Sequence, residues 1–454
     1  MAEKTIAAIS TPKGEGGIAV IRISGDNAIS IADKCFLSAS GKRLTSLSGY
    51  SAAFGEAVRQ DGSRIDEAVA LVFRAPKSYT GEDIVEISVH GGFVPANECL
   101  KSVFSAGAYP AEAGEFTKRA FLNGKIDLAE AESVMEIIGA RSAAALTIAK
   151  SAKDGKLSRD VENVTEKLLG LAASLAAYSD FPDEDIEGLD TESFKNLLDD
   201  CLLSLSKLLA TFSVGQAVLC GVPTAIIGKP NVGKSTLMNA LSGEERSIVT
   251  DLAGTTRDIV EAAVSVGKVS LLLSDTAGIR ETEDKIESIG VDRAVKRLSS
   301  AALVLAVFDV SKPFDNNDKR IIDRLAGKEC IAVLNKSDLP AVADLSLLKG
   351  FNAVPVSAKN GTGIKELSEK IEEICGTDRL TADDTVLINE RQYSCALRAQ
   401  SALKDAKEAL LSGVTLDAVS VAIDDAVNAL LELSGRKATE SVTNEIFSKF
   451  CVGK

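Results

Sequence analysis

The octapeptide GKPNVGKS at residues 228–235 constrains the fold of this chain more than any other stretch. It follows the apolar run TAIIG and opens TLMNALSG, whose apolar spacing predicts a helix. Gly228 and Gly233 let the backbone turn so that its N–H groups face an anion at the helix N-terminus. A glycine-rich turn of this spacing between a strand and a helix predicts a P-loop, and this context argues against a chance turn.

Strands and helices alternate from residue 217 to residue 377. SLLLSDTAG, ALVLAVFDV and CIAVLNKSD are apolar runs that each end at a polar loop. Such runs are typical of a parallel sheet that binds its ligand at the carboxyl ends of the strands. We therefore predict a Ras-like α/β P-loop domain over residues 217–377.

Further motifs follow the P-loop in the order expected of a GTPase. Lys234 is expected at the β- and γ-phosphates, and Ser235 together with Thr256 of GTTRD is expected to ligate magnesium (Mg²⁺). DTAG offers Asp275, which would reach the metal from a strand end, and the Gly278 amide for the γ-phosphate. Together these residues predict a binding site for a nucleoside triphosphate with Mg²⁺.

The motif NKSD at residues 335–338 selects the base. A carboxylate at Asp338 accepts from guanine N1–H and N2–H₂, which adenine cannot supply, so GTP is predicted and ATP is not. Asn335 and Lys336 would brace this loop and cover the base, and SAK (357–359) would supply an amide to the guanine oxygen. The predicted GTP-binding set is Asn231, Val232, Gly233, Lys234, Ser235, Thr236, Thr250, Asp251, Leu252, Ala253, Gly254, Thr255, Thr256, Asp275, Thr276, Ala277, Gly278, Asn335, Lys336, Ser337, Asp338, Ser357, Ala358 and Lys359.

The residue after DTAG is Ile279, where many GTPases carry a glutamine that orients the attacking water. The downstream stretch RETEDKIESIG carries several carboxylates, among them Glu287. From spacing alone, this stretch is equally a water-orienting switch or a solvated acidic helix start. Spacing identifies no arginine finger.

The flanking regions predict different folds. Residues 1–118 mix β-type runs such as DIVEISVHGG with helical runs, which predicts an α+β domain. Residues 119–216 and 378–454 show apolar residues three and four apart and are predicted to be helical. The fold class is therefore a multidomain α+β protein whose P-loop GTPase domain is inserted into a helical domain. Such an insertion is tolerable because the ends of a compact domain often lie close together.

Composition restricts the partners and the compartment. The net charge of −14 argues against a chain-wide electrostatic grip on nucleic acid, so an RNA contact has to be local or shared with a partner. The 8 cysteines form no C-x-x-C pair. No apolar run reaches the roughly 18 residues of a membrane span. We expect a cytoplasmic protein with reduced thiols and no membrane segment.

Several local strings, together with these motifs, resemble the MnmE (TrmE) family of bacterial tRNA modification GTPases over essentially the full chain. Val452 is a mild departure, because the family ending is usually Cys-Ile-Gly-Lys. The strings are STPKGEGGIAVIRISG, SYTGED (78–83), HGG (90–92), GEFTKRAFLNGKIDL, DFPDE and the final FCVGK.

For the GTPase domain, the resemblance implies a potassium ion (K⁺) beside the phosphates, where another GTPase places an arginine finger. It implies that Glu287 acts on the attacking water through a bridging water and that Arg280 supports the switch, so that Glu287, Arg280 and Lys234 form the catalytic set. It also implies a homodimer in which two GTPase domains face each other. The implied K⁺ ligands are Asn231, Thr250, Thr255 and the Leu252 carbonyl.

For residues 1–118, the resemblance implies a folate-binding and dimerisation domain related to one-carbon transferases. Contacts to 5-formyl- or methylene-tetrahydrofolate map onto Arg22, Glu86, Lys125 and Lys454. A pterin offers N–H donors to a carboxylate, and its glutamyl tail suits Arg or Lys. Without the resemblance, Arg22 and Glu86 would pass for ordinary strand residues.

Two residues remain ambiguous at this level. Cys451 is either a thiolate nucleophile or, as its chemistry favours, a small packing residue, since free cysteine is commonly buried. His90, the only histidine, is either an acid/base group or a structural residue of its turn, and the lack of a visible partner favours the second interpretation.

The function implied by the resemblance is a K⁺-dependent GTPase that takes part in 5-carboxymethylaminomethyl-type modification of the wobble uridine of certain tRNAs. A separate FAD-dependent partner of the MnmG (GidA) family would form a hetero-oligomer with it, the folate would supply a one-carbon unit, and glycine or ammonium the nitrogen. One alternative is a ribosome-assembly GTPase switch, which should carry a basic RNA-binding appendage. The other is a stand-alone folate aminomethyltransferase, which needs no nucleotide.

Overall fold

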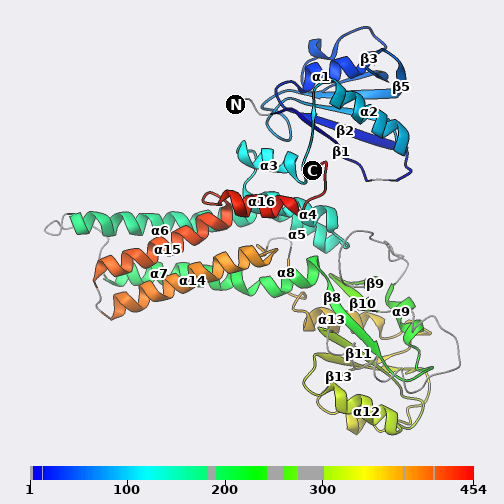
Figure 1. Cartoon of the computed structure of the whole chain (residues 1–454). Coiled ribbons are helices and arrows are strands. Elements are labelled where there is room, and N and C mark those ends of the chain that lie inside the picture. Colours follow the sequence, from blue (N-terminus) through cyan, green and yellow to red (C-terminus); the bar gives the residue numbers. More distant parts are fainter. Residues whose placement is uncertain are drawn as a thin grey trace. The chain divides into compact units, whose positions relative to one another are not determined.

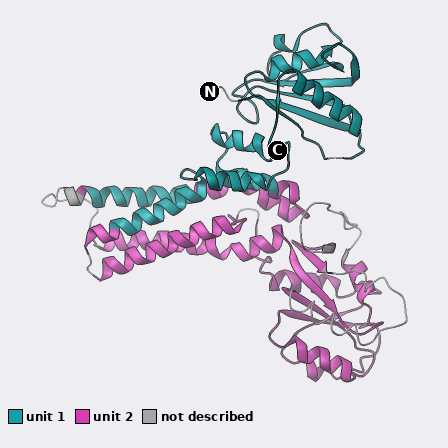
Figure 2. Ribbon diagram, viewed as in Figure 1, with its two compact units in different colours: residues 1–135, 161–176, 420–454 teal, residues 136–160, 177–419 magenta. Residues whose placement is uncertain are grey.

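The computed structural model forms two compact units, which are shown in Figures 1 and 2. The first contains residues 1–135, 161–176 and 420–454, and the second contains residues 136–160 and 177–419. The described residues are 4–12, 14–180, 191–242, 260–274, 301–381, 384–412 and 415–454.

The first unit is built on a seven-stranded sheet of order β3-β4-β5-β6-β2-β1-β7. All described pairs in it are antiparallel except β1 with β7. Side chains alternate along β2 and β6 between a buried and a partly exposed face, as strand geometry requires. Helices α1 (Ala28–Cys35) and α2 (Phe93–Ser105) cover the buried face. The strands are β1 (Ile6–Ile9), β2 (Ile18–Ser24), β3 (Phe36–Ser38), β4 (Ser51–Val58), β5 (Arg64–Phe73), β6 (Ile84–His90) and β7 (Tyr109–Pro110), with a 3₁₀ turn at Leu44–Ser46.

The opposite face of this sheet is covered only in part. Phe116 of α3 (Glu115–Leu122) and Tyr79 pack over the β1 end of the face. Elsewhere on the same face, β2, β3, β4 and β5 each carry a large apolar side chain that is exposed. These side chains are Ile18, Leu37, Phe54 and Val69.

Among the remaining helices of the first unit, α4 and α16 share a core that contains two phenylalanines near the end of the sequence. Phe447 and Phe450 form one core with Leu128 and Ala131. Gly435 lies so close to Leu128 that an added Cβ would be 2.4 Å from the Leu128 Cβ. The helices are α4 (Leu128–Gly139), α6 (Lys156–Asp180), α15 (Leu416–Ser434) and α16 (Glu440–Ser448), of which α4, α6 and α15 continue across the unit boundary.

The second unit contains a six-stranded sheet of order β13-β12-β11-β8-β10-β9, parallel except for β9. Every residue of β11 and β12 is buried, as expected for parallel strands that are covered on both faces. The elements are β8 (Val222–Ile227), α9 (Lys234–Ser242), β9 (Val260–Val266), β10 (Val269–Ser274), β11 (Leu303–Asp309), α12 (Asn316–Leu325), β12 (Cys330–Asn335), a 3₁₀ turn at Leu345–Leu348, β13 (Asn352–Val356) and α13 (Ile364–Ile374).

Helices α7 (Thr191–Ala210) and α14 (Glu390–Leu411) of the second unit pair along their length. Gln400 Nε2 donates to Ser206 Oγ at 2.8 Å, and Lys407 pairs with Asp199. The helical stretch Glu192–Leu219 is long and apolar enough to cross a membrane, with a mean hydropathy of 1.5. A single helix of this kind is weak support for a span, because core helices of soluble proteins meet the same criterion. The other helices are α5 (Ala143–Lys153) and α8 (Phe212–Leu219).

The chain enters and leaves the α/β part at one place. Gln216 Nε2, on α8, donates to the Ile388 carbonyl at 2.9 Å. The Leu387 N–H donates to Thr211 Oγ1 at 3.2 Å. The two connections therefore run together, which is the geometry of an inserted domain. The predicted fold class, an α/β P-loop domain inserted into a helical domain beside an α+β region, is confirmed.

Candidate functional site

The P-loop lies between β8 and α9, as its motif predicts. Gly228 has φ 152° and Gly233 has φ 98°, and Asn231 also has a positive φ of 61°. A Cβ at Gly228 would lie 2.4 Å from the Val307 carbonyl oxygen, and one at Gly233 would lie 2.3 Å from Asn335 Nδ2. Glycine is therefore required at both positions by close approach as well as by backbone conformation.

Lys234 is the first residue of α9, and its ammonium contacts the backbone of the P-loop. Its Nζ donates to the Gly228 carbonyl at 2.9 Å and to the Lys229 carbonyl at 2.8 Å. Ser235 and Thr236 follow in the first turn of the same helix, where both are exposed. The predicted phosphate and Mg²⁺ ligands of the P-loop thus gather at one helix N-terminus.

Asn335 joins three of the predicted motifs. Its side chain is buried at the end of β12, where Nδ2 donates to the Val232 carbonyl at 2.7 Å. Its Oδ1 accepts from the Ala358 N–H at 3.0 Å. The P-loop, the NKSD motif and the SAK motif are therefore held together by one amide, which uses both its donor and its acceptor.

Asp338 faces the SAK motif. Ser357 Oγ donates to Asp338 Oδ1 at 2.6 Å, and this hydrogen bond holds the pKa of the carboxyl below its ordinary value. The Ser337 N–H donates to the Val356 carbonyl at 3.1 Å, and Lys359 is exposed. One carboxylate oxygen of Asp338 is thus tied to the SAK motif, which fixes the orientation of the group.

Lys336 pairs with Asp309, a residue that the motif analysis missed. The ammonium donates to Asp309 Oδ2 at 2.6 Å, and Lys336 adopts a positive φ of 63°. Burial opposes ionisation of Asp309, but the Lys336 and Ser311 hydrogen bonds hold its pKa below the ordinary value. The available signal was a carboxylate at the carboxyl end of a buried parallel strand, because β11 ends at Asp309.

Many of the predicted GTPase residues lie outside the described residues. They include both catalytic residues of the switch, Glu287 and Arg280, and most of the implied K⁺ ligands. The full set is Thr250, Asp251, Leu252, Ala253, Gly254, Thr255, Thr256, Asp275, Thr276, Ala277, Gly278, Arg280 and Glu287.

In the first unit, Arg22 and Glu86 form a pair across β2 and β6. They are register partners in the sheet, and Arg22 Nε donates to Glu86 Oε1 at 2.8 Å. The side chains are 16% and 21% exposed, so the pair is only partly open to solvent. The guanidinium carbon lies 5.6 Å from the ring centroids of both Tyr79 and Phe116. The Arg22 cation thus lies near two aromatic rings and beside a carboxylate acceptor on this face of the sheet.

The last residues of the sequence lie against this pair. Arg22 Nη1 donates to the Gly453 carbonyl at 3.3 Å. The Phe116 N–H donates to the Lys454 carbonyl at 3.2 Å. Gly453 has φ 97°, and an added Cβ there would lie 2.4 Å from the Ile9 carbonyl oxygen. The segment 451–454 thus reaches the predicted folate residues, although sequence spacing gave no sign that Gly453 would contact Arg22.

Lys125 lies on the turn after α3 rather than on the sheet. Its ammonium donates to the Pro76 carbonyl at 3.1 Å. Its side chain also packs beside Gly81, where an added Cβ would lie 3.3 Å from Lys125 Cγ. Lys125 therefore contacts the segment that carries Tyr79, and Tyr79 in turn contacts Arg22.

Cys451 differs from the interpretation favoured by its sequence context, and His90 has a partner that the sequence did not reveal. His90 has a partner, because its Nδ1 lies 2.8 Å from Asp66 Oδ1. Hydrogen bonding to Asp66 raises the pKa of His90 above its ordinary value. Cys451 is exposed, so its interpretation as a buried packing residue is wrong. Its backbone carbonyl accepts from the Gly114 N–H at 3.3 Å.

Comparison with known proteins covers the whole chain. The family described as MnmE helical domain matches residues 128–451, and the family described as GTP-binding protein TrmE N-terminus matches residues 5–125. The tRNA modification GTPase MnmE of Moorella thermoacetica is 42% identical over 464 residues, covering 100% of each chain. The MnmE of Geobacillus kaustophilus is 40% identical and covers 99% of each. Among solved structures, the G domain of the T. maritima FeoB iron transporter covers 33% of this chain and 96% of its own, with 28% identity and a TM-score of 0.25.

Proposed function

The chain belongs to the MnmE family of tRNA modification GTPases and is a GTP hydrolase that acts in tRNA modification, and we propose that it does so as a K⁺-dependent, folate-binding homodimer. The observation that carries this proposal is identity of about 40% along the whole chain rather than in the GTPase part alone. We propose that the N-terminal domain spans residues 1–118, the GTPase domain residues 217–377, and the helical domain residues 119–216 and 378–454.

We propose that GTP is held by the P-loop and by the NKSD and SAK motifs. The Lys234 ammonium, now on the loop carbonyls, would turn to the β- and γ-phosphates. The Ser235 hydroxyl at the start of α9 would ligate Mg²⁺ together with Thr256. Support comes from Asn335, whose amide already ties the phosphate-binding loop to the base-binding motifs.

The hydrolytic step is proposed to use K⁺ and Glu287. Ile279 cannot orient water, so a carboxylate further along the switch takes this role, with Arg280 supporting the loop. Asn231 projects from the exposed, left-handed turn of the P-loop, which suits a side-chain ligand for K⁺. Thr250, Thr255 and the Leu252 carbonyl would complete the shell. A bound K⁺ supplies positive charge where charge develops between the phosphates.

A homodimer is proposed through the first unit. The uncovered sheet face carries Ile18, Phe54 and Val69 with exposed fractions of 64%, 60% and 38%. Apolar side chains that extend over several strands of one face are typical of an interaction surface. A second copy covering this face would remove them from water, and it would hold two GTPase domains within one assembly.

The folate proposal starts from the Arg22–Glu86 pair. Glu86 can accept from the N–H groups of a pterin, and Lys125 and Lys454 can meet the carboxylates of a glutamyl tail. The partly exposed Arg22–Glu86 pair supplies both a cation and a carboxylate, which fits 5-formyl- or methylene-tetrahydrofolate. A folate bound there would supply the one-carbon unit that becomes attached to the uridine.

The remaining parts of the reaction are assigned to partners. We propose that a separate FAD-dependent protein of the MnmG (GidA) family carries the redox step and forms a hetero-oligomer with this chain in the cytoplasm. Their target would be the wobble uridine of certain tRNAs, which acquires a 5-carboxymethylaminomethyl-type group. The net charge of −14 supports sharing the tRNA contact with a partner.

The test is complementation of a strain that lacks its own copy of the gene. Lys234→Ala removes the phosphate-binding ammonium, so wobble-uridine modification should fall to the level of the empty strain. Lys365→Ala, an exposed lysine of α13, is the control and should restore modification. Tandem liquid chromatography and mass spectrometry of tRNA nucleosides provides the measurement. Normal modification with Lys234→Ala would contradict the proposal and favour the stand-alone folate aminomethyltransferase.

A further inference from the structure

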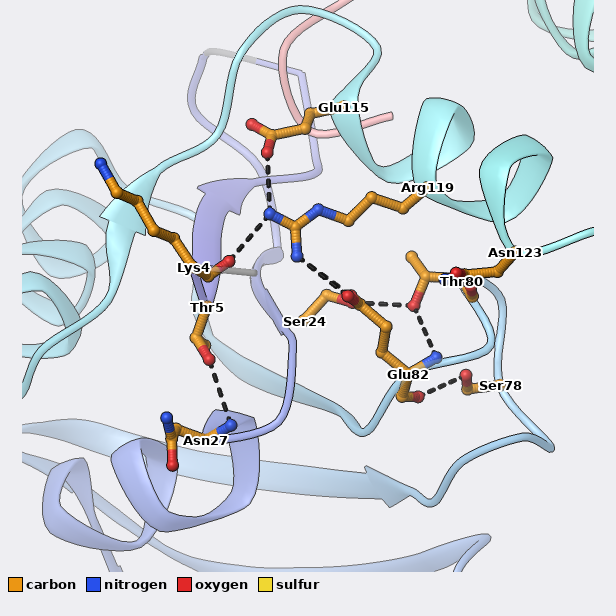
Figure 3. Close-up of polar contacts among 10 residues, drawn as sticks. All are labelled: Lys4, Thr5, Ser24, Asn27, Ser78, Thr80, Glu82, Glu115, Arg119 and Asn123. Carbon is orange, nitrogen blue, oxygen red and sulfur yellow. Dashed lines mark hydrogen bonds and ion pairs between the residues drawn. The ribbon is translucent and has the colours of Figure 1, made fainter. Parts of the chain in front are cut away.

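Arg119 on α3 is a buried cation that binds two other segments of the first unit and a residue of its own helix, as Figure 3 shows. Its Nη1 donates to both carboxylate oxygens of Glu82, at 3.0 and 3.2 Å. Its Nη2 donates to Glu115 Oε1 and to the Lys4 carbonyl, each at 2.8 Å. The Arg119 and Glu82 side chains are only 7% and 12% exposed. A buried charge of this kind depends on keeping its partners, so Glu82 has little freedom to move.

Glu82 belongs to the SYTGED loop (residues 78–83), which connects β5 to β6 and is held from two sides. From β2, Ser24 Oγ donates to Glu82 Oε2 at 2.6 Å and lies 2.8 Å from Thr80 Oγ1. From the turn after α3, Asn123 Nδ2 donates to the Thr80 carbonyl at 2.8 Å. Within the loop, Ser78 Oγ donates to the Glu82 carbonyl at 2.5 Å. The loop is therefore fixed by polar contacts centred on Glu82 (Figure 3).

Tyr79 lies on the same loop and is the residue through which it contacts the predicted folate site. Its ring packs against the Arg22 guanidinium, and its hydroxyl lies 2.9 Å from Thr117 Oγ1 of α3. Burial raises the pKa of the phenol, so Tyr79 remains neutral beside the cation. Because Arg22 also donates to Glu86, the position of the Tyr79 ring limits where the Arg22–Glu86 pair can lie.

We propose that Arg119 is a positioning residue of the folate site, which acts by holding Glu82 and thereby keeping Tyr79 packed on Arg22. This role rests on the proposed folate binding. It adds to that site a set of supporting residues that position Arg22 without contacting the ligand. It assigns a role to two strings of the sequence at once, since SYTGED supplies Glu82 and Tyr79, and GEFTKRAFLN supplies Arg119, Thr117 and Asn123.

The experiment is a double-mutant cycle measured by calorimetric titration with 5-formyl-tetrahydrofolate. Arg119→Lys keeps the charge, but its single nitrogen cannot replace both Nη1, which binds Glu82, and Nη2, which binds Glu115 and Lys4. Tyr79→Leu removes the ring. Each should weaken binding roughly tenfold, the size of a coupling within one network. If Arg119 acts through Tyr79, the double variant binds no more weakly than the weaker single variant. GTP turnover should stay at the level of the unaltered chain in all three variants.

The control is Arg59→Lys, because Arg59 also pairs with a carboxylate, Glu98 at 3.1 Å, elsewhere in the same unit but in a more exposed position. It should leave folate affinity unchanged. All titrations are made at a temperature where circular dichroism shows the variants to be folded. If Arg119→Lys does not fold, Glu82→Gln replaces it in the same cycle, since it removes the carboxylate charge with little change of shape.

Two outcomes overturn the proposal while leaving folate binding intact. One is unchanged affinity in Arg119→Lys, or in Glu82→Gln where that variant replaces it. The other is a double variant whose loss is the product of the two single losses, which indicates independent structural effects. Failure of the unaltered chain to bind 5-formyl-tetrahydrofolate is a different result, because it overturns the proposed folate function together with this inference.

Discussion

Asp66 is the neighbour that most strongly shifts the pKa of His90. The imidazole is exposed, and its Nδ1 lies 2.8 Å from the Asp66 carboxylate. The hydrogen bond raises the pKa of His90 above 6.5, the ordinary value. A raised folded pKa means that the pair stabilises the folded chain below the unfolded pKa. This contribution is lost as pH rises through the folded pKa.

The titration can be followed directly, because His90 is the only histidine. In Asp66→Asn the charge and the strong acceptor are lost, so the pKa of His90 should fall toward its ordinary value. Nuclear magnetic resonance of ¹³C-labelled histidine measures this shift from the pH dependence of the ring signal. Asp61→Asn is the matched control, since Asp61 bonds to Ser63 and should leave the midpoint unchanged. An identical midpoint in Asp66→Asn would show that the pair does not control the titration.

Asp338 is predicted to select guanine by its acceptor oxygens. In Asp338→Asn an amide donor replaces one acceptor, which mismatches guanine and matches xanthine, whose 2-position carries an oxygen. We expect GTP affinity to fall by about 100-fold or more and XTP affinity to rise, because a site built on hydrogen bonds rejects an unpaired group strongly. Fluorescent analogues of both nucleotides measure the two dissociation constants. Asp344→Asn, at the 3₁₀ turn, is the control, and unchanged GTP affinity in Asp338→Asn would contradict the assignment.

Some residues of the two candidate sites could be predicted from the sequence, and others could not. The P-loop was predictable because its glycines, strand and helix are contiguous, and the NKSD motif because each of its residues has a fixed role. Arg22 and Glu86 are 64 positions apart, and Arg22 and Gly453 are 431 apart. Nothing in the spacing predicts such contacts, since they depend on how β2, β6 and the end of the sequence are brought together. Only the family resemblance identified Arg22 and Glu86 in advance.

Among the elements of the first unit, the backbone of the segment 451–454 lies in close contact with the backbones of β1 and the start of α3. The Cys451 and Lys454 carbonyls accept from N–H groups at the start of α3, and Gly114 and Val452 lie at this contact. An isolated bridge joins Ala113 and Val452. The segment therefore satisfies helix N–H groups that would otherwise lack partners within the helix.

Gly453→Ala tests this element. The new Cβ would lie 2.4 Å from the Ile9 carbonyl, so the segment has to move and Arg22 loses its contact with Gly453. Gly62→Ala is the matched control, because Gly62 has a similar φ of 81° but nothing within 4 Å of an added Cβ. The control should cost about 1 kcal/mol of unfolding free energy, and Gly453→Ala roughly 1–3 kcal/mol more.

Denaturant unfolding followed by circular dichroism measures these costs, and calorimetric titration measures folate affinity. We expect weaker folate binding in Gly453→Ala but not in Gly62→Ala, with GTP turnover unchanged in both. Equal unfolding costs for the two variants would show that the segment is not held by close approach.

In the molecule as a whole, the residues of the proposed folate site and the described residues of the predicted GTP site lie in separate units with separate cores. The proposed folate residues belong to the first unit, and the described residues predicted to bind GTP belong to the second. The described polar contacts of each site lie within its own unit, so variants at the residues of one site should leave the basal chemistry of the other site intact. Coupling between the two chemistries would then appear only in tRNA modification, where both are needed.

GTP turnover by the proposed dimer should depend on which monovalent cation is present. A K⁺ beside the phosphates would supply the charge that an arginine finger supplies elsewhere, and the smaller Na⁺ would fit a K⁺ shell poorly. Replacing K⁺ by Na⁺ at constant ionic strength should therefore slow turnover by roughly 100-fold, the size of one lost electrostatic contact. Rb⁺, which is close to K⁺ in size, is the control and should sustain turnover.

Glu287→Ala should abolish turnover in K⁺ while fluorescent GTP still binds, because the carboxylate acts on the water and not on the nucleotide. Phosphate release measures turnover, and equal rates in K⁺ and Na⁺ would contradict the potassium assignment whatever the result for Glu287.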